Sequence, residues 1–317
     1  MYDTFRFRRA TMRLHLVVLS AALTGVLSGP GLAQDQSTAS ATLTLAQFVK
    51  EHGGTERINL SAKLRMLSQR IPAVACVYAA RGDDELAKTH LNAALDEFEK
   101  IAKGLEFGDD SLGMFGPEES AKALKGLKIL GEEWAPLAAA ARDLLAAGGT
   151  QPEALAQIYA QEPKVLEIAK KLAVEIGAIY TDPNSLTIGG AMTIDIAGRQ
   201  RMLLQKMTKE ACQISTGGGT ADTATALQAT VDTFDKTLAA MIDGLPEAGM
   251  PPAPTPEIRQ ALETLRADWQ AARAPIDGVM GGTALDAAAL AALMVTTDGL
   301  VQEMNKIVAA YSASATF

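Results

Sequence analysis

The sequence predicts an all-α fold, with two tandem up-down-up-down four-helix bundles that arise from an internal duplication and are related by a pseudo-two-fold axis. Alanine and leucine are abundant, aromatic residues make up only 5% of the chain, and alternating β-branched stretches are scarce. Such a composition is typical of helical proteins. The length of 317 residues suits about two domains.

The duplication rests on a thirteen-residue stretch that occurs twice. INLSAKLRMLSQR begins at Ile58, and IDIAGRQRMLLQK begins at Ile194. The shift that carries Ile58 onto Ile194 also carries Cys76 onto Cys212, Phe98 onto Phe234 and Lys100 onto Lys236, and it relates Trp134 to Trp269 to within one position. Residues related by this shift are called equivalent below. The repeat is far too long for a solenoid, so each copy is predicted to be a whole domain or half-domain.

Residues 1–33 are predicted to be a cleaved signal peptide. Four arginines precede an apolar run from Leu14 to Leu27. Gly31-Leu32-Ala33 is a small-residue cleavage site before Gln34. The run is shorter than the ~20 residues that a spanning helix needs. No later segment is long and apolar enough to span a bilayer. We therefore expect a periplasmic or secreted protein without a membrane span after cleavage, and a flexible tail over residues 34–43.

Charge argues against one class of partner. Residues 1–33 hold four arginines and one aspartate, so their removal changes the net charge from −8 to −11. Nucleic acid would repel such a chain, and we expect no nucleic-acid partner. A small anion remains possible, because a local pair of arginines outweighs a diffuse surface charge.

The first repeat is predicted to occupy residues 44–182. Gly82 and Asp83 end its first helix, and Asp83 is a suitable N-cap for the second. A glycine-rich loop follows the second helix, and Thr150 is placed to cap the fourth ahead of Pro152. The expected helices span about 44–81, 84–106, 117–147 and 151–180.

The second repeat is predicted to occupy residues 183–317 and to follow the same plan. Its breaks are three consecutive glycines at 217–219, the proline-rich stretch 251–254 and the glycine pair at 281–282. Short connections favour antiparallel neighbours, hence the up-down-up-down order in both bundles. The expected helices span about 186–215, 221–243, 255–275 and 284–311.

Each copy of the repeated stretch is predicted to be a helix that is buried on two sides. In the first copy one apolar stripe comprises Leu60, Leu64, Leu67, Ile71 and Val74. A second face carries small residues, then an arginine, a glutamine and a cysteine. Its members are Ile58, Ser61, Ala62, Arg65, Gln69 and Cys76 in the first copy, and Ile194, Ala197, Gly198, Arg201, Gln205 and Cys212 in the second. A buried arginine needs an anionic partner, which is either a nearby carboxylate or a bound anion.

The two stretches resemble the signature helix of the N-terminal domain of type IV pili methyl-accepting chemotaxis transducers, a motif that also occurs in the periplasmic sensors of nitrate/nitrite histidine kinases. The resemblance implies a four-helix bundle with the motif on its first helix. It also implies that two such helices meet across a dimer axis, where an arginine from each holds one small anion. The matching residues are Arg65 and Arg201. The nitrate sensors carry the motif once per chain, and this second copy replaces Ser68 with Leu204 and Arg70 with Lys206.

Fusing two copies would build within one chain the interface that such relatives build by dimerising. On this hypothesis Arg65 and Arg201 face one small inorganic anion, nitrate or nitrite, with Asn59, Asp195, Gln69 and Gln205 as polar neighbours. The chain shows no kinase or methylation region, so a membrane sensor or transducer protein would receive its state. The alternative is an envelope or pilus-associated helical scaffold without a small ligand.

Nothing in the sequence indicates an enzyme, a cofactor or a metal site. The three histidines are too scattered for a metal cluster, and no haem-attachment, phosphate-loop or nucleophile motif is present. Two acidic pairs do recur at equivalent positions. They are either solvated helix faces or carboxylates that orient the motif arginines. The pairs are Asp96 with Asp232 and Glu167 with Glu303.

The chain has two cysteines, Cys76 and Cys212, at one equivalent position of the repeats. Near a two-fold axis, equivalent positions are the ones that meet, and export would allow a disulfide to persist. Such a bridge would clamp the two motif helices. Two buried free thiols, each packed in its own bundle, are the alternative.

Overall fold

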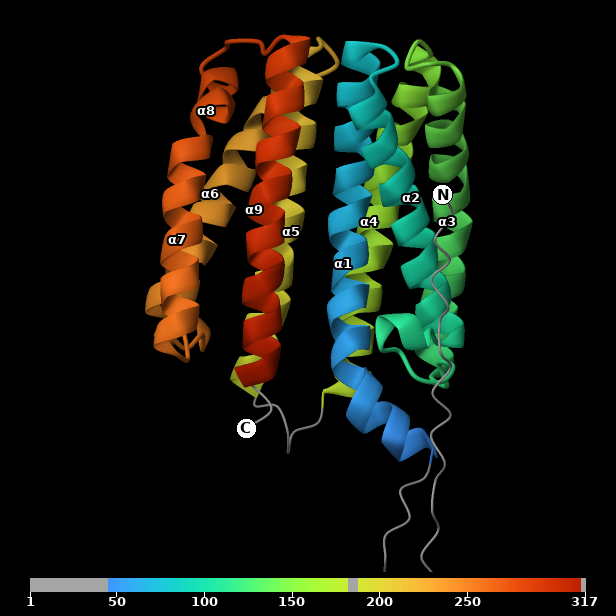
Figure 1. The fold of residues 1–317 in the computed structure, drawn as a ribbon, viewed down its shortest axis with the longest axis vertical. Helices are drawn as coiled ribbons and strands as arrows, with labels where there is room; N and C mark the ends of the chain where they lie inside the picture. Colours follow the sequence, from blue (N-terminus) through green and yellow to red (C-terminus); the bar gives the residue numbers. More distant parts are fainter. Residues whose placement is uncertain (1–44, 182–187, 315–317) are drawn as a thin grey trace, which may run out of the picture. The chain divides into compact units, whose positions relative to one another are not determined.

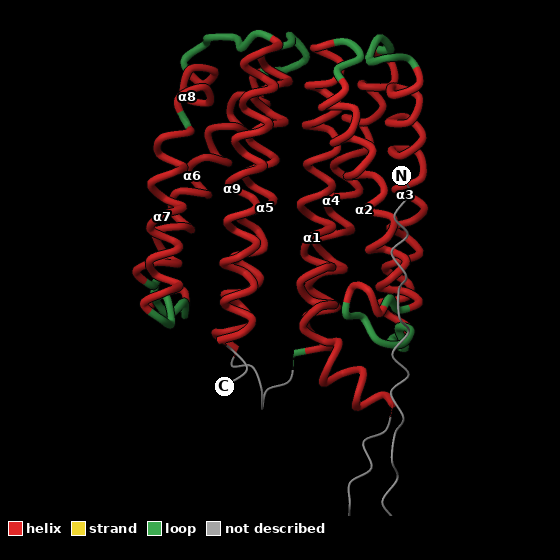
Figure 2. Tube along the Cα trace, viewed as in Figure 1, coloured by secondary structure: helices red, strands yellow, loops and turns green. Residues whose placement is uncertain are grey.

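The computed structural model describes residues 45–181 and 188–314, and the regular structure of these residues is entirely helical. They belong to one compact unit. The predicted signal peptide (1–33) and tail (34–43) lie outside the described residues. Figure 2 shows the loops gathered at the ends of the helices. None of the described helices combines the length and apolar character that a bilayer crossing requires.

The first repeat forms a bundle of four antiparallel helices, as predicted (Figure 1). A short 3₁₀ turn, η1, lies in the connection between the second and third helices. The elements are α1 (Leu45–Arg81), α2 (Glu85–Phe107), η1 (Asp110–Leu112), α3 (Ala121–Ala146) and α4 (Pro152–Tyr180).

The second repeat follows the same course with one additional break. Its elements are α5 (Ile188–Ser215), α6 (Ala221–Asp243), η2 (Pro246–Ala248), α7 (Pro256–Ala272), α8 (Ala274–Met280) and α9 (Ala287–Ser314). The predicted helix 255–275 was wrong at its end, because α7 stops at Ala272 and α8 starts at Ala274. Pro275 lies in the first turn of α8, and a proline cannot donate the backbone hydrogen bond that would continue α7.

Two predicted caps were displaced by one position. Asp84, not Asp83, caps α2 by accepting a hydrogen bond from the backbone N–H of Ala87. Asp83 instead adopts a positive φ of 45°, and its carboxylate accepts a hydrogen bond from the Tyr78 hydroxyl. Gln151 precedes α4 without a side-chain cap, whereas the Thr150 hydroxyl donates back to the carbonyl of Ala147. Neighbouring polar residues compete for a cap position, and sequence alone does not rank them.

The duplication extends into the connecting loops. Asp109 and Met114 form an isolated antiparallel bridge around η1, and the equivalent residues of the second repeat, Leu245 and Met250, form the same bridge around η2. The glycines that leave α2 and α6, Gly108 and Gly244, share a φ of 84°. The loop sequences differ enough that their identical course was not visible in the sequence.

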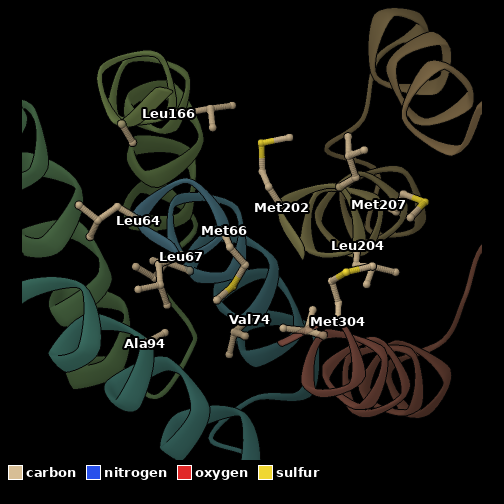
Figure 3. Close-up of a cluster of buried hydrophobic side chains, with 14 of the residues drawn as sticks. Leu64, Met66, Leu67, Val74, Ala94, Leu166, Met202, Leu204, Met207 and Met304 are labelled. Atoms are coloured by element: carbon tan, nitrogen blue, oxygen red, sulfur yellow. The ribbon is translucent and has the colours of Figure 1, made fainter. Parts of the chain in front are cut away.

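The two bundles meet through their first helices. α1 packs against α5 at the centre, and α9 also packs on α1. Figure 3 looks into this region, where Met66 of α1, Leu204 of α5 and Met304 of α9 share one apolar cluster. Both faces of α1 predicted to be buried are buried over the described side chains: Leu64 and Leu67 on one, Cys76 on the other, all with no exposed area. α1 and α5 therefore form the shared spine of the molecule.

Candidate anion-binding site between the repeats

Arg65 of α1 and Arg201 of α5 point toward each other in the interface between the repeats. Only 1% of Arg65 and 2% of Arg201 is exposed to solvent. The small residues of the motif make this approach possible. A Cβ atom on Gly198 would lie 3.3 Å from both the Ala62 Cβ and the Arg65 Nη2, and 3.4 Å from the Arg201 Nη2. The two guanidinium groups thus converge on one point of α5, and a larger residue at 198 would crowd them.

The arginines take equivalent partners across the interface. Arg65 Nη1 lies 2.7 Å from Asp195 Oδ1 of the second repeat, and Arg201 Nη2 donates to Asn59 Oδ1 of the first repeat at 3.1 Å. Asn59 and Asp195 are themselves equivalent residues of the two repeats. One arginine is therefore neutralised by a carboxylate, whereas the equivalent arginine meets a neutral carboxamide.

The other partner of Arg201 is also neutral. Its Nη1 donates to Asn305 Oδ1 of α9 at 2.9 Å. Two donor atoms in this pair have no hydrogen-bond partner among the described residues, Nε of Arg201 and Nη2 of Arg65, and both are buried. Because unsatisfied buried donors are costly, these nitrogens are positions at which an anionic acceptor would be stabilised.

Positive charge is in excess at the site. Asp195 Oδ2 lies 2.7 Å from the Nη2 of Arg199 as well, so one carboxylate serves two guanidinium groups. Burial, and then the charge of Arg65, lower the pKa of Arg201 to about 10. Burial also lowers the pKa of Arg65, against the opposing effect of Asp195. Both arginines remain charged at neutral pH, and an anion placed between them would relieve their repulsion.

A cavity of about 270 Å³ lies beside Arg201, between α1, α4 and α5. Arg201 and Asp195 line it on one side, and small residues of α4, Ala173, Gly177 and Ala178, line it on the other. Its volume is close to the lower end for ligand pockets, which suits an ion of a few atoms. Arg201 therefore adjoins a space in which a small ligand fits, and Arg65 lies on the other side of the pair.

The two motif glutamines donate outward to the lateral helices. Gln69 donates to Glu162 of α4, and Gln205 Nε2 donates to Asp298 Oδ1 of α9 at 2.9 Å. Glu162 and Asp298 again occupy equivalent positions. No contact with either arginine is seen for these glutamines in the described part of the chain, so their role in ligand binding stays a prediction.

Glu162 and Asp298, the carboxylates that accept from the motif glutamines, also form ion pairs with cations of the opposite repeat. Lys209 Nζ of α5 lies 2.8 Å from Glu162 Oε2, and Arg70 of α1 forms an ion pair with Asp298. His90 Nδ1 lies 3.1 Å from the other oxygen of Asp298. Sequence reasoning missed both carboxylates, because Glu162 and Asp298 are alike in charge but not identical.

The recurring acidic pairs lie away from the arginines, and all but Glu303, whose Oε2 is buried, face solvent. Asp96, Asp232 and Glu167 are exposed, Glu303 is partly exposed, and none of them contacts a motif arginine in the described residues. These pairs lie on helix faces away from the site. The interpretation as solvated faces is the one that the structure supports.

A disulfide joins Cys76 to Cys212, with 6.2 Å between the two Cα atoms. The bond ties α1 to α5 about three helical turns beyond the arginine pair. Equivalent positions of the two repeats therefore meet at this level, and the spacing of α1 and α5 is fixed covalently on one side of the site.

The fold and the site together define a duplicated helical bundle with a buried arginine pair between its two copies. The chain belongs to the PilJ family, the N-terminal domain of type IV pili methyl-accepting chemotaxis transducers, whose family profile matches residues 46–160 and 188–296. The first matched segment begins in α1, which carries Arg65, and the second begins in α5, which carries Arg201. Each repeat is therefore one copy of the domain. The resemblance inferred from the two thirteen-residue stretches is confirmed. The family is sensory and not enzymatic. No curated protein matches the chain.

Proposed function

We propose that this chain is an exported sensing module that binds one small monovalent oxyanion, nitrate or nitrite, between Arg65 and Arg201. The observation that carries the proposal is the charge imbalance between the repeats. Arg201 is buried with only the carboxamides of Asn59 and Asn305 as partners, and Asp195 is shared between Arg65 and Arg199. A planar oxyanion suits planar guanidinium groups, which donate pairs of parallel hydrogen bonds.

Fusion of the two copies gives this arrangement a property that a homodimer lacks. In a homodimer both copies carry the same residue at the position of Asn59 and Asp195, so both arginines have the same partner. Here the first copy has an amide and the second a carboxylate. The covalent duplication thus leaves one of the two motif arginines, Arg201, without a carboxylate partner, which favours one monovalent anion over two.

Isothermal titration calorimetry on the purified chain without residues 1–33 tests the proposal. Nitrate and nitrite should each bind with a stoichiometry of one per chain. Chloride is a single spherical ion without two oxygens to accept parallel hydrogen bonds, and it should bind more weakly. Absence of heat with both oxyanions at millimolar concentration, from protein whose helical circular dichroism is intact, would sink the proposal.

A scaffold without a small ligand is the second candidate, and one observation favours it. Arg65 already has a carboxylate partner at 2.7 Å, as expected of an arginine that serves only to hold helices together. Thermal melts separate the two candidates. A sensing module should melt at a higher temperature as nitrate is added, since a ligand that binds the folded state stabilises it. A scaffold should show no shift.

The location and partner follow from the same proposal. Export would place the module in the periplasm, where a membrane sensor or transducer protein would read its state. Amino-terminal sequencing of the protein from an envelope fraction should give Gln34 as the first residue. A membrane-bound form that retains residues 14–33 would contradict cleavage.

A further inference from the structure

A second cavity, of about 490 Å³, opens on the other side of Arg65. It lies between α4, α5, α6 and the η2 loop, whereas the smaller cavity beside Arg201 lies between α1, α4 and α5. Its volume falls within the usual range for ligands of drug or metabolite size. We refer to it as the α5–α6 groove. It shares Arg65 and Arg199 with the oxyanion proposal, and Arg201 and the other residues named there do not line it.

The α5–α6 groove has an apolar end and a cationic end. Around the start of α5 and the η2 loop its walls are apolar, with Met192, Leu245, Ala248 and Met250. About two turns further along α5 the walls carry four cations, Arg65, Arg199, Lys170 and Lys236, beside the apolar Met202 and Leu203. The groove follows α5 from Met192 to Leu203, a length of about 16 Å. A ligand with an apolar tail and an anionic head matches this gradient.

The apolar end is open to solvent. Val174, Met192 and Leu245 are among the few large hydrophobic side chains that the described surface exposes, and all three line the groove. Figure 3 shows Met202, another lining residue, extending from α5 on the side of α4, where Leu166 lies. Exposed apolar side chains that gather around one concavity indicate a binding site, and methionines adapt their shape to flexible apolar groups.

The cationic end has an unsatisfied donor. Arg65 is 1% exposed, lines the groove, and its Nη2 has no hydrogen-bond partner among the described residues. Its Nη1 is occupied by Asp195. No ion pair of Lys170 or Lys236 is seen in the described part of the chain, so both ammonium groups remain available at the rim. A carboxylate at this end would gain one buried donor and the field of several cations.

The first repeat carries a filled version of the same space. Thr237 and Ala248 of the groove are equivalent to Ile101 and Leu112 of the first repeat, both of which are larger. Ala240 is equivalent to Gly104, against which the methyl group of Met114 packs so closely that a Cβ atom there would overlap it. Met250 cannot take that position beside Ala240. The smaller Thr237 and Ala248, and the different position of Met250, thus leave space where the first repeat has side chains.

From these observations we infer that the α5–α6 groove binds a medium-chain alkyl carboxylate, with the chain against Leu245, Ala248 and Met250 and the carboxylate beside Arg65. The ligand is distinct in chemistry from nitrate, which has no apolar part. The two sites are therefore separable by their ligands, and the variants below separate them by their residues.

Octanoate is the probe, and 1-octanol is its uncharged counterpart. By calorimetry one octanoate should bind per chain, and 1-octanol should bind at least about tenfold more weakly, because the charged hydrogen bonds at the head are lost. The double variant Thr237→Ile/Ala248→Leu, which introduces the residues of the first repeat, should weaken octanoate binding at least about tenfold and leave nitrate binding unchanged. Ala288→Leu, the same enlargement at an exposed site of α9, should change neither.

Arg201→Gln completes the test, since it should weaken nitrate binding but leave octanoate binding in place. Lys236→Gln, at an exposed position of the rim, should also weaken octanoate binding. It replaces the double variant in the test if that variant loses its helical circular dichroism. The inference is overturned if octanoate fails to bind, if octanol binds as tightly, or if octanoate binds the correctly folded double variant as well as the wild type. It is also overturned if ultracentrifugation shows a dimer that Ala248→Leu abolishes, because a second copy of the chain would then be the occupant.

Discussion

Arg65 and Arg201 hold equivalent positions of the two repeats, yet the partner that each takes from the other repeat differs in charge. Arg65 meets the carboxylate of Asp195, and Arg201 meets the carboxamide of Asn59. In both cases the arginine of one repeat contacts a residue of the other repeat. The comparison teaches that duplication preserved the geometry of the interface while allowing its charge to become asymmetric.

A third buried arginine shows what a purely structural role looks like. Arg57 donates to the backbone carbonyls of Leu105, at 2.8 Å, and Gly116, lies 3.6 Å from Glu118 and stacks over the ring of Tyr180. It therefore fastens the first half of α1 to the end of α2 and the loop that follows it. Arg201 has no comparable carboxylate among the described residues, which sets it apart as a group with unused charge.

The largest expected effect on stability comes from the disulfide, which joins the helices that carry Arg65 and Arg201. The double variant Cys76→Ser/Cys212→Ser should lower the free energy of unfolding by about 4–5 kcal/mol, because the bond closes a long loop in the unfolded chain. Urea denaturation followed by circular dichroism measures the change. The wild-type protein in reducing agent is the matched control and should behave like the double variant.

The state of the cysteines is open to direct measurement. Alkylation of the unreduced, unfolded protein should leave both cysteines unmodified, and alkylation after reduction should add two groups, as mass spectrometry will show. Two alkylated thiols without reduction would mean that the bridge does not form in solution, and the expected stability difference would then vanish.

The next largest expected effect is the loss of nitrate affinity when either arginine is replaced. Arg201→Gln should weaken nitrate binding by about 1.5–3 kcal/mol, roughly tenfold to 150-fold, because a charged hydrogen-bond donor is removed. Arg65→Gln should have a smaller effect, because Asp195 already compensates part of the Arg65 charge. Calorimetry on both variants gives the order, and the double variant should not bind at all.

Stability should respond in the opposite order. Arg65→Gln removes a buried ion pair and should destabilise the fold, although Arg199 remains beside Asp195. Arg201→Gln removes a buried charge without a carboxylate partner and should cost little or even stabilise the fold. Nitrate binding that persists in the double variant would place the ligand elsewhere.

The sequence predicted the helices and the pairing of the repeats well, because these depend on local signals. Glycine and proline clusters mark helix ends, and the two-sided burial of α1 follows from its apolar stripe and small residues. The partners of the arginines depend on which helices lie beside α1 and α5. The constant shift between the repeats could have exposed Glu162 and Asp298, but only if charge, and not identity, had been compared. The recurring identical acids lie on helix faces away from the arginines.

A third pair of variants acts on the asymmetry itself. Asn59→Asp would give Arg201 a carboxylate and make the two cross-repeat contacts alike, and we expect nitrate affinity to fall about tenfold, since the added negative charge repels the anion. Asp195→Asn makes these contacts alike in the other direction, with two amides, and should raise the affinity. Calorimetry at low ionic strength gives both values. Equal affinity in the two variants would contradict the role given to charge.

The smallest effect at physiological pH, and the most specific, is the pH dependence of nitrate binding. The ligand requires a charged Arg201, whose pKa is lowered to about 10 by burial and by Arg65. Affinity should therefore be constant from about pH 6 to 9, where the guanidinium is protonated, and should fall as pH rises through about 10, approaching tenfold for each pH unit because one proton is linked to binding. The bound anion favours the charged form, so the complex loses its proton at higher pH than the free protein. In the Asn59→Asp variant the new carboxylate raises the pKa of Arg201, and the decline should move to higher pH. Calorimetry from pH 7 to 11, with circular dichroism to confirm that the helices persist, measures both profiles. An identical decline in the two proteins would mean that a group other than Arg201 controls it.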